Sequence, residues 1–223
     1  MGPAGYTLSD LLMFSPEVYF RLFVLYNQAV WPVQVVVVVL TGAIVALTRR
    51  PSAAATRTVA GLMAVSWAGI AGFFLLQRYA EINLAAPCFA AGFALQAVLW
   101  SGVAVAGRPR LRWAGDRVGA AGLGLLATAA VALPLLGPLS GREWVGMELF
   151  GLAPDPTALG TLGLLLMVPR SPWWLWPVPA AWCGITGLTY LAMGFHTGLL
   201  TAALGAVAVV IRGLGAGRRP VRE

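Results

Sequence analysis

Apolar residues occur along this chain in long runs, and short stretches between the runs carry most of the charged residues. The runs are about 20 residues long, which is longer than strands usually are. A helix rises about 1.5 Å per residue, so a run of this length crosses roughly 30 Å of hydrocarbon. Helices also satisfy their own backbone hydrogen bonds in lipid. The pattern therefore predicts an all-α, polytopic transmembrane helical bundle.

The runs predict about seven spans, with boundaries placed to within a few residues. They cover residues 29–48, 57–77, 83–106, 118–137, 155–169, 173–193 and 197–213. The fifth run is short, and the sixth carries Pro177 and Pro179 near its start. A six-span arrangement, in which part of this region merges or re-enters, therefore remains an alternative.

A helix-start signature precedes the first span. Ser15 can cap a helix, Pro16 fits its first turn, and Glu17 faces the positive end of the helix dipole. The residues that follow mix large apolar side chains with charged ones, which is typical of a helix in the membrane interface or one that feeds into the first span. We divide the chain into an N-terminal interfacial segment (1–28), a transmembrane helical domain (29–213) and a basic cytoplasmic tail (214–223).

Composition agrees with this architecture. The chain is 59% hydrophobic and 10% charged, whereas soluble domains carry about 25% charged residues. Its mean hydropathy is +0.81. The net charge of +7 suggests nucleic acid as a partner, but the arginines lie at the ends of apolar runs and form no basic stripe interleaved with aromatics. These observations exclude nucleic acid and make the lipid bilayer the expected partner.

The distribution of arginines predicts the orientation. If the N-terminus lies outside, only Arg21, Arg78 and Arg142 are external, and all other arginines are cytoplasmic. This is the distribution that the positive-inside rule requires. We therefore expect a multi-pass protein of a bacterial cytoplasmic (inner) membrane, with its N-terminus outside and its C-terminus inside.

Two spans are interrupted by proline at their outer ends, at residues 27–34 and 150–157. An interrupted helix exposes backbone groups to which a solute can bind. Several polar and aromatic side chains lie near these interruptions or at the same side of the membrane. Our candidate binding residues are Asn27, Trp31, Gln34, Glu148, Asp155 and His196.

Each candidate also has a structural interpretation. Asp155 and Pro156 are typical of an N-cap followed by proline at the first helical position. Trp31 could belong to an aromatic belt at the membrane interface. The outer carboxylates could be the solvated remainder of the positive-inside distribution. Gln96, within the third span, needs a hydrogen-bonding partner and favours a contact between helices over a solute path.

Motifs for catalysis or cofactor binding are absent from the sequence. It contains no GxSxG, no HExxH and no phosphate-binding glycine loop. The sole histidine, His196, has no second histidine beside it, and Cys88 and Cys183 form no CxxC motif. We expect no metal, no cofactor and no catalytic site, although a membrane hydrolase or transferase that uses the outer carboxylates stays an alternative.

These features favour a small-solute transporter or permease, of unknown substrate, with an outer vestibule formed by spans 1, 5 and 7. The second hypothesis is a non-catalytic accessory or assembly subunit of a membrane complex, or a homo-oligomer, that makes its contacts through Gly- and Ala-rich faces. A transporter predicts a water-accessible polar cavity that reaches the midplane. An accessory subunit predicts a packed interior and a large apolar face left open.

The chain also resembles a family of bacterial multi-pass membrane proteins with a domain of unknown function. Three segments carry the resemblance: residues 15–34 with their Tyr-Asn-x-Ala-x-Trp-Pro-x-Gln motif, the outer loop at 78–83, and Phe-Gly-Leu-x-Pro-x-Pro-Thr at 150–157. The family often has Cys between the two prolines, where this chain has Asp155. The resemblance implies a membrane location and no specific activity, and a thiol-based role at that position would not extend to this protein.

Overall fold

The computed structural model describes residues 14–196 and 198–216, and every regular element in these residues is a helix. A helix lies in each of the seven predicted runs and one more precedes them, so the predicted all-α class is confirmed. Residues 1–13 and most of the predicted tail lie outside the described residues. The α-helices are α1 (Pro16–Ala29), α2 (Val33–Thr48), α3 (Ala53–Gly69), α4 (Ala86–Ala106), α5 (Arg117–Ala127), α6 (Leu133–Leu139), α7 (Pro154–Met167), α8 (Pro177–Ala192) and α9 (Gly198–Ala216).

Three continuous helices of the described residues are long and apolar enough to cross a membrane: Ala53–Glu81, Ala86–Ala106 and Arg117–Leu139. The first continues α3 through the π-helical segment η2 (Ile70–Leu76), and the last joins α5 to α6 through the π-helical segment η4 (Thr128–Ala132). The pair α1–α2 would make a fourth span, but it is bent by 91°.

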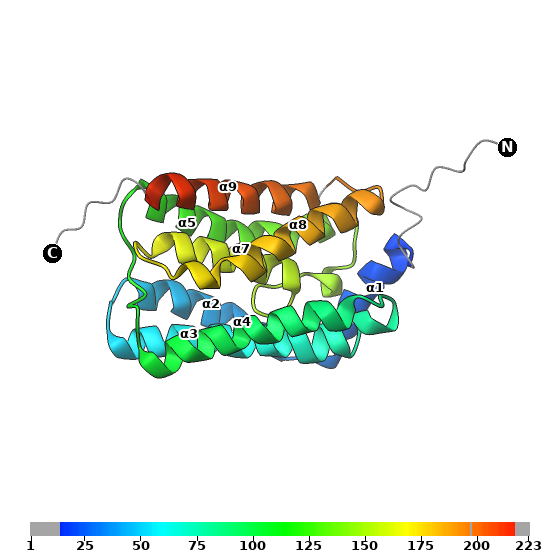
Figure 1. Cartoon of the computed structure of the whole chain (residues 1–223). Helices are drawn as coiled ribbons and strands as arrows, with labels where there is room; N and C mark the ends of the chain where they lie inside the picture. Colours follow the sequence, from blue (N-terminus) through cyan, green and yellow to red (C-terminus); the bar gives the residue numbers. More distant parts are fainter. Residues whose placement is uncertain (1–13, 197, 217–223) are drawn as a thin grey trace.

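Helix α7 lies in the middle of the bundle. Figure 1 shows α3 and α4 on one side, α5 and α9 on the other, and α7 and α8 between them. All 14 residues of α7 are buried. At about 1.5 Å per residue, α7 is only about 21 Å long. Neighbouring helices enclose it along its whole length, so a short helix can lie here with its ends covered by protein.

Side-chain caps start several helices. The Ser15 hydroxyl accepts a hydrogen bond of 3.5 Å from Val18 N, and Pro16 occupies the first turn of α1, which confirms the predicted helix start. Ser52 caps α3 in the same way, and Asp116 caps α5. Each cap satisfies a backbone N–H that lacks an intrahelical partner.

Helix α1 covers one end of the bundle (Figure 1). Its buried side presents aromatic rings to the C-terminal end of the long helix Ala53–Glu81: Phe23 stacks on Phe74 at 4.8 Å between ring centroids, and Tyr19 meets Tyr79 at 5.8 Å. Helix α2 is packed far less well. Only Ile44 and Thr48, at the end of α2 remote from α1, are buried.

Helices α5 and α7 approach so closely that only glycine fits between them. A Cβ atom added at Gly122 would lie 2.5 Å from the Gly163 carbonyl oxygen, and one added at Gly163 would lie 2.7 Å from the Gly122 carbonyl oxygen. Such contacts of small residues let helix backbones meet directly in membrane proteins.

We predict that Gly122→Ala lowers the free energy of unfolding by about 1–3 kcal/mol, because the methyl group overpacks the α5–α7 contact. Gly124→Ala is the control on the same helix, since a Cβ atom there meets nothing within 4 Å and alanine favours helix. Thermal and urea unfolding in detergent would measure both variants. Equal stability of the two variants would contradict the close α5–α7 contact.

Candidate functional site

The connection between α6 and α7, residues 140–153, runs from the α1 end of the bundle toward its interior. Asn27 fixes its outer part, since Asn27 Nδ2 donates hydrogen bonds of 2.6 Å to the Val145 carbonyl and 2.8 Å to the Met147 carbonyl. Its inner part passes between α2 and α3 at Gly151, where an added Cβ atom would meet Ser66 and Val37. We call residues 140–153 the re-entrant segment.

Glycine is needed at position 151 for two reasons. Its φ of +89° lies in the left-handed region that L side chains rarely adopt, and Ser66 Oγ would lie 3.3 Å from a Cβ atom there. The Gly151 N–H donates a hydrogen bond of 2.8 Å to Thr157 Oγ1 on α7. The turn therefore directs the chain into α7 below the outer end of the bundle.

Asp155, in the first turn of α7, lies within the bundle. Its Oδ1 atom accepts hydrogen bonds of 2.8 Å from Trp182 Nε1 and from Thr186 Oγ1, both on α8. Those donors lie ten and six residues before Ala192, where α8 ends, which corresponds to depths of about 15 and 9 Å. The Asp155 carboxyl is thus well below the end of α8. The N-cap interpretation of Asp155 is wrong, because α7 starts at Pro154 and Ala153 is the cap residue.

Glu148 is the second buried carboxylate. Its Oε1 atom accepts a hydrogen bond of 3.0 Å from Arg142 Nη1 and one of 3.4 Å from the Tyr190 hydroxyl. Arg142 also stacks on the Phe20 ring of α1, with its guanidinium carbon 4.2 Å from the ring centroid. The ion pair therefore connects the re-entrant segment to α8 and, through the ring, to α1.

A cavity of about 30 Å³ lies between these groups. Its lining comes from α6, the re-entrant segment, α7, α8 and α9, and comprises Leu133, Leu136, Arg142, Glu148, Asp155, Tyr190, Gly198 and Thr201. The volume is close to that of one water molecule. Two buried carboxylates and one guanidinium share this space, so the set carries a net charge of −1 when all three are ionised. We call Arg142, Glu148 and Asp155 the carboxylate cluster.

The structure thus brings together two of the six predicted binding residues, Glu148 and Asp155. Predicted spans 5 and 7 contribute to the cavity as α7 and α9, whereas α2, the first predicted span, does not line it.

Three of the other candidates, Asn27, Trp31 and Gln34, line a separate hollow of about 430 Å³ beside the re-entrant segment. Asn27 holds the re-entrant segment, and Gln34 Nε2 donates a hydrogen bond of 2.6 Å to the Asn27 carbonyl. Trp31 is 68% exposed. His196, in the α8–α9 connection, is also exposed and does not line the cavity.

Sequence reasoning missed the hydrogen-bonding partners that α8 provides. Trp182, Thr186 and Tyr190 are spaced four residues apart, so they form one stripe on the helix. All three donate to the two carboxylates. A polar and aromatic stripe in an apolar run was the signal available in the sequence. Gln96 does make a contact between elements, because its Nε2 atom donates a hydrogen bond of 3.0 Å to the Leu175 carbonyl.

Fold and site define an all-helical protein, with several helices apolar enough for a membrane and a small set of buried ionisable groups. The chain belongs to DUF6064, a family of unknown function, which matches residues 16–215 and so confirms the expected family resemblance. No curated protein and no solved structure matches the chain. Within the described residues, no group of three or more His, Cys, Asp or Glu side chains could hold a metal ion.

We predict that Arg142 and Glu148 are coupled energetically, by about 1.5–3 kcal/mol, as expected for a hydrogen bond between charged groups. Side chains in this pair are 27% and 8% exposed. The control pair, Arg21 with Glu143 at 3.6 Å, is 55% and 63% exposed, so its coupling should be about 0–1 kcal/mol. Double-mutant cycles of Arg→Gln and Glu→Gln variants, followed by unfolding in detergent, would measure both values. Equal coupling energies in the two pairs would show that the ion pair between Arg142 and Glu148 stabilises the protein no more than an exposed ion pair does.

Proposed function

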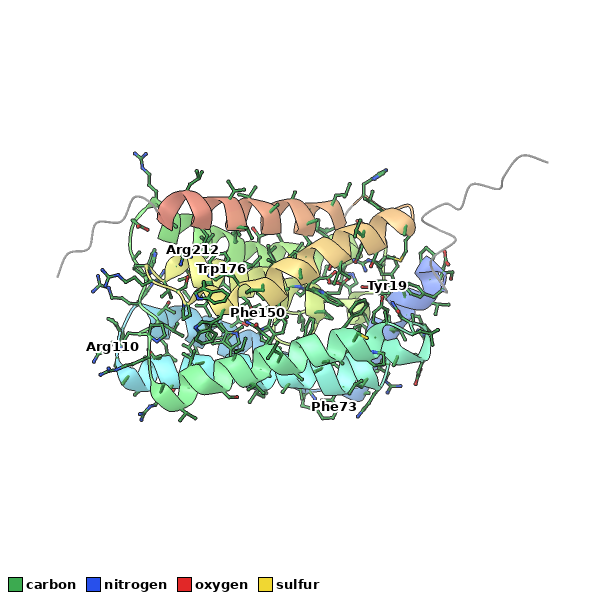
Figure 2. All side chains as sticks on the ribbon, in the orientation of Figure 1. Tyr19, Phe73, Arg110, Phe150, Trp176 and Arg212 are labelled. Carbon is green, nitrogen blue, oxygen red and sulfur yellow. The ribbon has the colours of Figure 1, made fainter. Side chains whose placement is uncertain are left out.

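We propose that the chain crosses a bacterial cytoplasmic membrane seven times, with α1 at the outer surface and the end of α9 in the cytoplasm. Two observations support this topology. The helices from α2 to α9 run back and forth between the two ends of the bundle (Figure 1). Arg110 and Arg212 lie at the end opposite to Tyr19 of α1 (Figure 2), as the positive-inside rule expects.

We further propose that the protein is a proton-coupled permease for a small solute, with Glu148 and Asp155 as the proton-binding pair. The observation behind this proposal is that two buried carboxylates face one cavity with a single guanidinium. A net negative charge inside a bundle is costly, and one bound proton removes it. Ionisable groups at membrane depth are typical of proton pathways.

The geometry of α7 supports the same function. Helix α7 starts inside the bundle after a non-helical segment, so the positive end of its dipole lies near the cavity. Pro154 and Pro156 have no N–H group, so the first turn offers the Asp155 N–H as a backbone donor. Interrupted helices of this kind form the substrate sites of several transporter classes. The cavity of about 30 Å³ has room for a proton or a water molecule and is smaller than the solute-accessible cavity that a transporter predicts.

The second candidate function is that of an accessory subunit. The exposed apolar face of α2 favours it. Side chains along α2 such as Val35, Val38 and Val39 are more than half exposed, and the helix is entirely apolar in this stretch. A partner helix of a membrane complex or of a second copy could cover this face. In that case the carboxylate cluster only stabilises the re-entrant segment.

We predict that single cysteines at the two ends of the bundle label from opposite sides. In a Cys88→Ser, Cys183→Ser background, Glu143→Cys should react with a membrane-impermeant maleimide in intact cells. Arg110→Cys should react only after permeabilisation. Labelling of both positions from the same side would rule out the proposed topology.

We predict that proteoliposomes of the native protein give solute-induced currents on a solid-supported membrane when amino acids, sugars, organic acids and inorganic ions are applied in turn. Asp155→Asn and Glu148→Gln should lower the proton-coupled current at least tenfold, because neither amide can carry a proton. Glu143→Gln is the control, since this carboxylate is exposed and outside the cavity. The absence of current for every solute class, or equal currents in all variants, would refute the permease function.

A further inference from the structure

A large groove, separate from the carboxylate cluster, runs along the surface between α2 and α3. Its volume is about 610 Å³, in the range of sites that bind sizeable ligands. Helix α2 forms one wall, and α3 with η2 forms the other. The floor consists of Phe150, Gly151 and Leu152 of the re-entrant segment.

The groove exists because α2 packs against the bundle mainly at its end remote from α1. Ile44 and Thr48 are its buried residues, so the part near α1 stands away from α3. Small residues on the opposite wall, Ser66 and Gly69, add to the space, and an added Cβ atom at Gly69 would meet nothing within 4 Å.

Polar groups occur at one end of the groove. Trp31, Gln77 and Arg78 line the end nearest α1, and aliphatic side chains such as Leu40, Ile44 and Leu62 line the remainder. Thr41 adds little polarity, because its hydroxyl donates a hydrogen bond of 2.7 Å to the Val37 carbonyl. The groove is therefore amphipathic along its length.

The length of the groove corresponds to one leaflet of a bilayer. Along α2 its lining extends from Val33 to Ile44, a rise of about 16 Å. Half of a hydrocarbon core of roughly 30 Å is about 15 Å. A single acyl chain of the leaflet near α1 would thus fill the groove from its polar end to the middle of the membrane.

The charge at the polar end selects the headgroup. Arg78 makes no ion pair with any side chain in residues 14–196 and 198–216, and no acidic residue lines the groove. A phosphate could accept hydrogen bonds from the Arg78 guanidinium, with the Trp31 ring beside it at the membrane interface. An ammonium headgroup would find no carboxylate in the lining.

We propose that this groove is a specific site for one anionic phospholipid, whose phosphate binds Arg78 and one of whose acyl chains lies between α2 and α3. The lipid replaces the packing that α2 lacks along most of its length. Neither Glu148 nor Asp155 takes part, so this site is independent of the proposed permease function.

The test is native mass spectrometry of the detergent-purified protein with equal concentrations of phosphatidylglycerol and phosphatidylcholine that have identical acyl chains. Native protein should retain one phosphatidylglycerol, in preference to phosphatidylcholine by about tenfold. Both headgroups carry the phosphate that Arg78 binds, but only phosphatidylcholine adds a quaternary ammonium, which the Arg78 guanidinium repels and no carboxylate in the lining pairs. Arg78→Gln should abolish this preference. Gly69→Leu, which fills the groove, should reduce the retention of both lipids.

Two control variants should bind lipid like the native protein. Gly61→Leu adds the same side chain on α3, outside the groove and without contacts within 4 Å at Cβ. Arg21→Gln removes a charge at the same end of the bundle. Equal retention of the two lipids by the native protein, or lipid retention unchanged in Gly69→Leu, would overturn the proposal. The proposal would also be overturned if the native protein formed a dimer without bound lipid and Gly69→Leu disrupted that dimer. A second copy of the chain would then occupy the groove.

Discussion

Hydrogen bonds from α8 to Asp155 hold the start of α7 inside the bundle, and the arrangement of the other elements follows from this contact. A buried carboxylate must be paired or hydrogen-bonded, and Trp182 and Thr186 meet that requirement from one helix face. The first turn of α7 is thereby fixed below the outer end of α8. The chain that leads into it then has to enter the bundle, which places Glu148 in the interior as well.

The packing of α7 is consistent with this position. The helix is buried along its whole length, so it needs neighbours on every side, and glycine pairs such as Gly122 with Gly163 let α5 approach. A further hydrogen bond, 3.2 Å from Trp67 Nε1 to Thr161 Oγ1, joins α7 to α3. Polar contacts and small residues thus hold the centre of the bundle together, as they do between helices of membrane proteins.

The positions of the helices could be predicted from the sequence, because a helix forms its backbone hydrogen bonds within one continuous apolar run. The sequence also predicted Glu148 and Asp155 as candidates, from the proline interruption and the apolar context. It assigned Asn27, Trp31 and Gln34 to the same vestibule as these carboxylates, whereas the structure places the three, around the 91° bend between α1 and α2, at a separate hollow. The stripe of donors on α8 is visible in the sequence, but its partners are not, because a contact between distant segments such as Asp155 with Thr186 leaves no local pattern.

The weak attachment of α2 has a mechanical consequence. The buried residues of α2, Ile44 and Thr48, lie at one end, and its other half is held by partly buried contacts such as Val37 and by the hydrogen bond from Gln34 to Asn27. That part touches the re-entrant segment, where Val37 lies beside Gly151. A movement of this half of α2 is therefore transmitted directly to the segment that carries Glu148.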